Sequence, residues 1–140
     1  MLEPFSRGGA YGRYFDGPAN VDFANDFVVI EEEELKQKPD LHLVVNLILL
    51  YRITRAMYET RDRKKLLIID ELKQQVGTTG EDDPVLAQVV EEAARRARKY
   101  GGALITATQG ADDYYATAAT TAAFNFSDWV FLLRQKQESI

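Results

Sequence analysis

The chain has 140 residues, 46% of them hydrophobic and 28% charged, so it is long enough for a globular core and is not composed like a disordered segment. It has no cysteine and one histidine, which excludes disulfides, thiolate metal sites and the usual His/Cys zinc sites. The net charge of -5 argues against a protein coated in nucleic acid, although a local basic surface stays open.

We predict a single domain over residues 1–140. Residues 1–26 are rich in glycine, aromatic residues and turn formers, which indicates an irregular, extended segment. From residue 27 to 140, strand and helix patterns alternate. Apolar runs predict strands at 27–30, 66–69, 103–108 and 129–133, and helical spacing predicts helices at 41–58, 85–100 and 112–123. This alternation is typical of a mostly parallel α/β sheet with right-handed crossovers.

Three positions predict where the helices begin and end. Asp40 is expected to cap the first helix, and Pro84 is expected to open the second after a polar loop at 77–83. The pair Gly101-Gly102 is expected to end that second helix, because glycine adopts the left-handed conformation that helix ends require.

The most informative stretch is residues 64–71, where two lysines and an apolar strand are followed by the adjacent carboxylates Asp70 and Glu71. Ligands bind at the carboxyl ends of strands in open α/β sheets. This is the form of a Walker B element, in which the Asp holds Mg²⁺, usually through water, and the Glu polarises the attacking water. The alternative is a buried strand that ends in solvated acids, and this stretch alone leaves both interpretations open.

Two further features are expected at the ends of the predicted strands. The strand at 103–108 is followed by Gln109, whose amide could bond both a γ-phosphate and the attacking water. Arg95 and Arg98 lie on the helix between the two strands, and they could act on a neighbouring subunit's nucleotide as arginine fingers. The alternatives are a polar loop residue and surface charges at a helix end.

Five blocks in a fixed order carry a resemblance to a known family. They are residues 12–18, 64–71, 95–102, 106–109 and 132–135. Together they resemble the C-terminal ATPase domain of the TraC-type conjugative-transfer proteins, which are the VirB-class ATPases of type IV secretion systems. The resemblance covers nearly the whole chain.

The resemblance implies a three-layer RecA-like P-loop fold that hydrolyses ATP, with Mg²⁺, at the subunit interfaces of a hexamer. It implies that Asp70 holds the metal through water, that Glu71 is the catalytic base, and that Gln109 senses the γ-phosphate. It also implies that Arg95 or Arg98 is a finger. Such a motor drives pilus assembly and substrate transfer with other secretion-system subunits, in the cytoplasm at the periphery of the inner membrane. Direct nucleic-acid binding is not expected.

The chain departs from the family in two places. It contains no G-x-x-x-x-G-K-[ST] phosphate-binding loop, and residues 8–17 are glycine-rich without a Gly-Lys pair. Because the family places that loop upstream, we expect a fragment that begins after the Walker A strand and helix. We expect this fragment alone to bind ATP weakly, to be inactive and to self-associate. Residues 72–75 stand where the family often has a small residue and a tryptophan.

Two other functions use the same features. One is a non-catalytic protein- or DNA-docking module of this fold, and the other is a DNA translocase or coupling protein of the FtsK/HerA kind. The stretch from Arg7 to Phe15 interleaves basic and aromatic residues as single-stranded nucleic-acid contacts do. A loop that buries its own aromatic residues is the preferred interpretation of that stretch.

Overall fold

The computed structural model describes residues 3–76 and 84–134, without the side chains of residues 84–86. The chain divides into two compact units, Met1–Glu34 and Leu35–Ile140. None of the described helices is long and apolar enough to cross a membrane.

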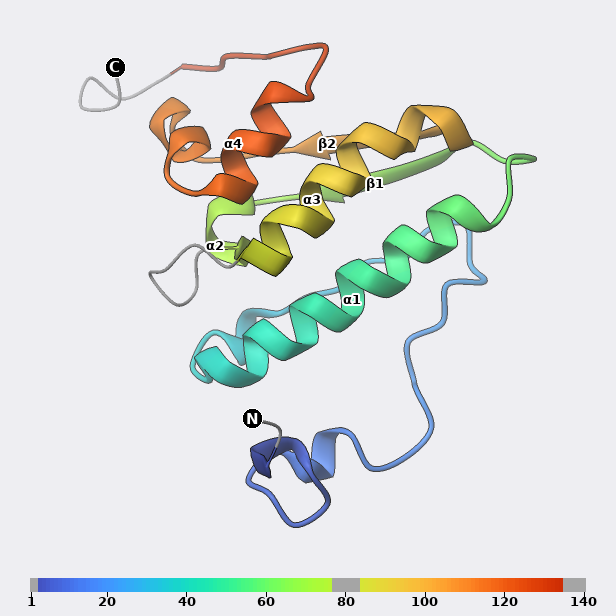
Figure 1. Cartoon of the computed structure of the whole chain (residues 1–140), viewed down its shortest axis with the longest axis vertical. Helices are drawn as coiled ribbons and strands as arrows, with labels where there is room; N and C mark the ends of the chain where they lie inside the picture. The colour runs from blue at the N-terminus through green and yellow to red at the C-terminus, as the bar shows by residue number, and fades with distance from the viewer. Residues whose placement is uncertain (1–2, 77–83, 135–140) are drawn as a thin grey trace. The chain divides into compact units, whose positions relative to one another are not determined.

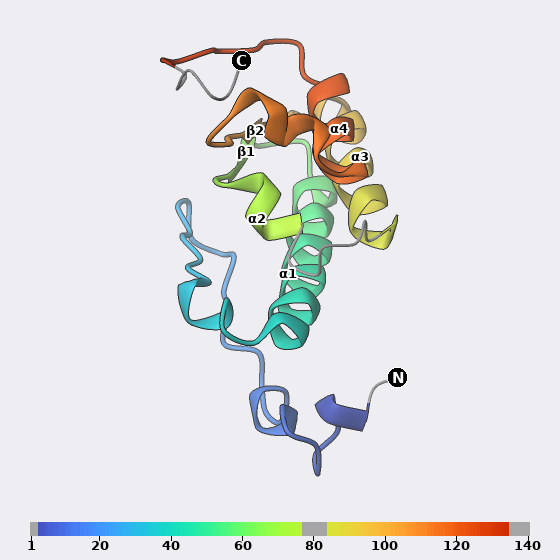
Figure 2. The same cartoon turned by 90° about the vertical axis from the view of Figure 1, so that its left-hand side faces the viewer.

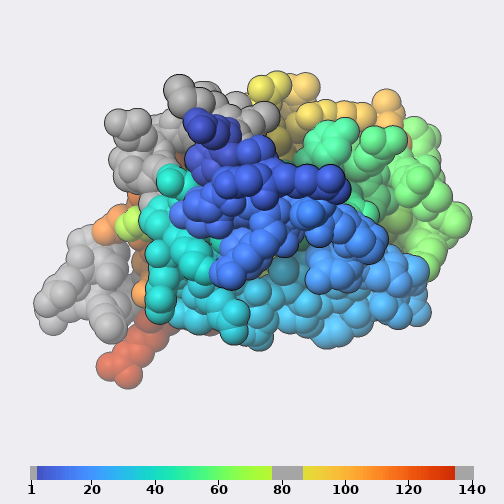
Figure 3. Space-filling view, turned by 90° about the horizontal axis from the view of Figure 1, so that it is seen from below, coloured from blue at the N-terminus to red at the C-terminus, as the bar shows by residue number. Residues whose placement is uncertain are grey.

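The first unit is built from tight turns around two glycines. A Cβ atom at Gly9 would lie 2.3 Å from the Glu3 carbonyl oxygen, and one at Gly12 would lie 2.1 Å from the Ser6 carbonyl oxygen. The Phe5 ring packs against Tyr11, with 5.4 Å between ring centroids. The first residues of this unit are the dark-blue atoms that lie together in Figure 3. The glycines are therefore required by close backbone approach within the turn itself.

The second unit combines helices with a small parallel sheet (Figure 1). Its helices are α1 (Pro39–Glu59), α2 (Leu72–Val76), α3 (Pro84–Ala97) and α4 (Ala118–Asn125), and its strands are β1 (Lys65–Ile69) and β2 (Gly102–Thr106). The strands pair in parallel, with Lys65 opposite Gly102 and Ile69 opposite Thr106. The predicted parallel α/β class is confirmed.

One face of the sheet is covered and the other is exposed. Figure 2 shows α1 and α3 on the same side of the two strands. The buried core lies among the helices and contains Leu72, Val76, Val90, Ala119 and Ala123. On the strands, Leu66, Ile68 and Ile105 are 55%, 59% and 49% exposed. The exposed sheet face, defined by these three side chains, is therefore apolar.

Two of the four predicted strands are wrong. Residues 27–30 and 129–133 form no strand and do not join the sheet of β1 and β2. Their side chains are largely in solvent, with Phe27 at 81%, Trp129 at 80% and Phe131 at 85% exposure. An apolar run becomes a strand only where a neighbouring strand completes its hydrogen-bond ladder, and neither run has that neighbour here.

The first two helices are confirmed with corrected ends. Pro39 lies in the first turn of α1, which starts after Lys38, so Asp40 lies inside the helix and does not cap it. Its carboxylate there still suits the positive end of the helix dipole. Helix α3 begins at Pro84, continues as the 3-10 turn η4 (Arg98–Tyr100), and ends at Gly101, whose φ is 69°. The polar loop predicted at 77–83 lies outside the described residues.

The third predicted helix, at 112–123, is split in two. Residues Ala111–Tyr115 form a 3-10 turn, η5, and α4 starts after Thr117. The Thr117 hydroxyl accepts a hydrogen bond from the Thr120 backbone N–H, and the Thr120 hydroxyl accepts one from the Thr117 N–H, both at 3.1 Å. This reciprocal cap fixes the start of α4 at Thr117 and so interrupts the expected continuous helix.

Candidate functional site

The candidate site lies where the two parallel strands end. Asp70 and Glu71 follow β1, and Gln109 stands three residues beyond β2. Backbone hydrogen bonds hold the two exits together: the Ala107 N–H donates to the Ile69 carbonyl, and the Leu72 N–H donates to the Ala107 carbonyl, each at 3.0 Å. The carboxyl edge of the sheet therefore brings the acidic pair and the glutamine side by side, as predicted.

The Gln109 side chain contacts the Glu71 carboxylate directly. Gln109 Nε2 donates to Glu71 Oε1 at 2.7 Å, and Lys36 Nζ lies 3.9 Å from Glu71 Oε2. Among the described residues other than glycine, Glu71 alone has a positive φ, at 48°. That left-handed backbone costs a residue with a Cβ about 1–2 kcal/mol, and such strain gathers at functional sites.

A pocket of about 200 Å³ opens beside this contact. Its lining residues come from the two strand exits, from α2 and from η5: Glu71, Lys73, Gln74, Thr108, Gln109 and Asp113. The pocket thus contains the carboxylate and the amide that are expected as base and sensor, together with an ion pair that no local pattern in the sequence indicates.

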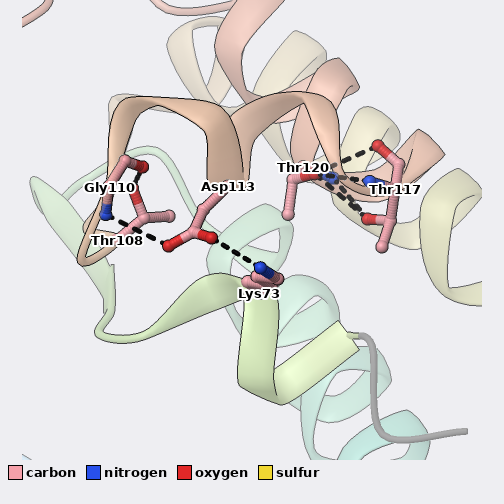
Figure 4. A network of polar contacts seen from close by, with 6 residues as sticks. All are labelled: Lys73, Thr108, Gly110, Asp113, Thr117 and Thr120. Atoms are coloured by element: carbon pink, nitrogen blue, oxygen red, sulfur yellow. Dashed lines mark hydrogen bonds and ion pairs between the residues drawn. The ribbon is translucent and has the colours of Figure 1, made fainter. Parts of the chain in front are cut away.

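That ion pair joins Lys73 to Asp113 at 2.7 Å (Figure 4). The second oxygen of Asp113 accepts a hydrogen bond from the Gly110 backbone N–H at 3.1 Å. The bond from Lys73 lowers the pKa of the Asp113 carboxyl, so this group stays ionised into the acid range. Lys73 belongs to residues 72–75, the segment in which the sequence departs from the family that it resembles.

Asp70 is suited to a magnesium ion held mainly by phosphates. Its Oδ1 accepts the Glu71 backbone N–H at 2.9 Å, while its side chain is exposed beside the strand end. Mg²⁺ keeps several waters and takes only one or two carboxylates alongside nucleotide phosphates. An exposed carboxylate with one oxygen fixed by backbone fits that requirement, so Asp70 could reach the ion through water.

The two candidate arginines lie away from this site. Arg98 belongs to η4, just before β2 begins, and it lines a second pocket with Lys64 and Lys65 at the opposite edge of the sheet. It forms an ion pair with Asp128, and Arg95 lies 3.9 Å from Glu91 on its own helix. Within one chain the arginines therefore do not converge with the acidic pair at the strand ends, and their expected role on a neighbouring subunit's nucleotide stays a prediction.

The geometry of the two strand ends indicates a class of protein. A parallel α/β unit with an acidic strand exit that faces a glutamine is typical of P-loop NTPases, which bind nucleotides, usually with Mg²⁺. The TraG P-loop domain matches residues 1–139, and the chain belongs to this family. The expected relation to conjugative-transfer P-loop proteins is confirmed at this level. No curated protein and no solved structure matched the chain.

Proposed function

We propose that this chain is part of the ATPase motor of a conjugative-transfer system of the type IV secretion class, with the carboxyl edge of the sheet as its hydrolytic site. The observation that carries the proposal is the 2.7 Å contact of Gln109 with Glu71, which stands on a strained backbone directly after Asp70. A solvated strand end needs neither the strain nor the pairing.

Glu71 is the base in this proposal. Its carboxylate polarises a water for in-line attack on the γ-phosphate, which is released as the bond to ADP breaks. Gln109 uses one N–H on Glu71, so its second N–H and its amide oxygen are left to contact the γ-phosphate and the water. The hydrogen bond between Gln109 and Glu71 keeps the two side chains close enough to act on the same attacking water.

Asp70 would hold Mg²⁺ through water, and the bound ion would supply charge neutralisation on the phosphates. Asp70 also accepts the Glu71 backbone N–H at 2.9 Å. The same carboxylate therefore fixes the backbone of the base, which links the metal position to the position of Glu71.

Arg95 or Arg98 acts on the nucleotide of a neighbouring subunit in this proposal. Both lie towards the opposite edge of the sheet from Glu71. In a ring of subunits, that edge of one subunit would face the carboxyl edge of the next, and the arginines would reach the nucleotide there. A hexamer at the periphery of the inner membrane, with other secretion-system subunits as partners, is part of the same proposal.

A non-catalytic docking module is the second candidate function. It is favoured by the exposed sheet face, because Leu66, Ile68 and Ile105 would be covered by a partner. In that case nucleotide would leave the carboxyl edge unaffected.

Titration of the isotopically labelled chain with ATP and Mg²⁺, followed by NMR, separates the two functions. The ATPase proposal expects weak binding, since no phosphate-binding loop is present in the sequence. The shifts should be confined to Asp70 and to the residues that line the pocket of Glu71 and Gln109. Asp70→Asn should weaken the Mg²⁺-dependent part of these shifts, and Asp16→Asn in the first unit is the control. Shifts elsewhere, or none at millimolar nucleotide, would contradict the proposed site.

A further inference from the structure

We infer that Lys73 and Asp113 form a positioning clamp that holds Gln109 against Glu71. The catalytic meaning of this clamp rests on the proposed function, whereas its effect on Gln109 is a property of the chain itself. Neither residue is assigned a role by the family match, and both line the 200 Å³ pocket with Glu71 and Gln109.

The clamp fixes both neighbours of Gln109. Asp113 accepts the Gly110 N–H at 3.1 Å, and the Thr108 hydroxyl donates to the Gly110 carbonyl at 3.0 Å (Figure 4). Gln109 therefore stands between two residues whose positions depend on a turn that Asp113 closes. If that turn opens, the base of the Gln109 side chain moves with it.

Asp113 is itself attached to the sheet. The next residue, Tyr114, donates its hydroxyl to the Thr106 backbone carbonyl at 2.9 Å, and it accepts a bond from the Thr121 hydroxyl at its own carbonyl at 3.1 Å. The turn η5 is thus tied to the last residue of β2 and to α4. Asp113 can serve as a fixed point for the loop that carries Gln109.

Lys73 is anchored from the other strand exit. It lies two residues after Glu71 on α2, whose Leu72 and Val76 are buried in the core. Asn46 of α1 donates to the Gln75 backbone carbonyl at 3.0 Å, which holds α2 from the other side. The Lys73–Asp113 bond therefore joins two anchored elements, 40 residues apart in sequence, across the pocket.

The contact between Gln109 and Glu71 needs such support because it is exposed. The Gln109 side chain lies in solvent and the Glu71 side chain is 35% exposed, so water competes for their single hydrogen bond. The Lys73–Asp113 bond joins two opposite charges and is half shielded, with 19% exposure at Asp113. Charge-assisted bonds of this kind are the stronger ones.

The test measures the water-exchange rate and chemical shift of the Gln109 side-chain amide protons in the folded chain. The signal is assigned by its loss in Gln109→Leu. In Lys73→Met and in Asp113→Asn the exchange should become about 2- to 10-fold faster, the change expected for loss of one hydrogen bond. Lys73→Arg should restore the wild-type rate, because it keeps the charge that pairs with Asp113.

The matched control is Arg7→Met, which removes the exposed ion pair of Arg7 with Asp16 at 3.0 Å in the first unit and should leave the Gln109 signal unchanged. An unchanged Gln109 amide in folded Lys73→Met would overturn the clamp, and Asp113→Asn gives the same decision if Lys73→Met does not fold. Nucleotide titration separates the two proposals. If millimolar ATP with Mg²⁺ leaves Asp70, Glu71 and Gln109 unshifted while Gln109 exchange is faster in Lys73→Met, the proposed function is refuted and the clamp stands.

Where turnover is present, Lys73→Met should lower kcat with little change in the KM for nucleotide. A rise in KM alone would mean that Lys73 contacts the nucleotide directly, and this outcome would contradict a positioning role.

Discussion

The side-chain amide of Gln109 donates a hydrogen bond to Glu71 Oε1 across 2.7 Å, although 38 residues separate the two in sequence. The contact exists because β1 and β2 are parallel neighbours whose carboxyl ends meet at one edge. Glu71 reaches this position by adopting a left-handed backbone, which the chain requires to turn from β1 into α2 within two residues.

The strain at Glu71 predicts a difference between two variants that both lose the carboxylate. Glu71→Gly relieves the left-handed backbone, whereas Glu71→Ala keeps a Cβ there and likewise loses the bond to Gln109, so Glu71→Gly should be the more stable by about 1 kcal/mol. Urea unfolding followed by far-UV circular dichroism gives the two free energies of unfolding. Equal stabilities would show that the positive φ at this position carries no cost.

The ion pair of the clamp predicts how stability depends on pH. Because Lys73 lowers the pKa of folded Asp113, the pair stabilises the fold fully above the pKa of an unfolded Asp, near 4, and this contribution is lost as pH falls through the lower folded value. The stability difference between wild type and Lys73→Met should therefore be constant from pH 5 to pH 7 and shrink below about pH 4. A difference that stays constant down to pH 2 would mean that Lys73 acts through packing alone.

Local sequence patterns predicted β1, β2, α1 and α3 because each of these elements carries its own signal. The apolar run before Asp70 and the helical spacing that ends at Gly101 are readable without any partner. The runs at 27–30 and 129–133 look equally strand-like, but a strand depends on a neighbour that no local pattern reveals. That Gln109 and Glu71 lie near each other followed from strand order, but their direct side-chain contact did not. The pairing of Lys73 with Asp113 depends on how a short helix and a 3-10 turn pack, which the sequence does not show.

The exposed sheet face predicts self-association of the chain. Leu66, Ile68 and Ile105 form an apolar surface on two strands whose outer edges are bare among the described residues, and such edges favour pairing between chains. Sedimentation velocity over a range of concentrations should show dimers or larger species. Ile68→Glu should weaken the association more than Ile48→Glu, a control at a 43% exposed position on α1. A monomer at every concentration would refute association through this face.

The position of the two arginines predicts a trans effect in the complete motor. Mixing Arg95→Ala or Arg98→Ala protein with Glu71→Gln protein should restore some ATPase activity, because each subunit supplies what the other lacks. Arg55→Ala, which removes an exposed charge on α1, should retain activity without mixing. If neither arginine variant is rescued at any ratio, Arg95 and Arg98 have only structural roles.

The assignment of Glu71 as the base is tested by single-turnover ATP hydrolysis in the assembled motor that carries Glu71→Gln. We predict wild-type binding of ATP with Mg²⁺ and a fall in the rate of the chemical step of about 100-fold or more, the usual contribution of a general base. The substitution keeps the size of the side chain and its capacity to bond Gln109, so the loss would report the carboxylate itself. Hydrolysis near the wild-type rate would contradict the assignment of Glu71 as the base and, with it, the assignment of the carboxyl edge as the hydrolytic site.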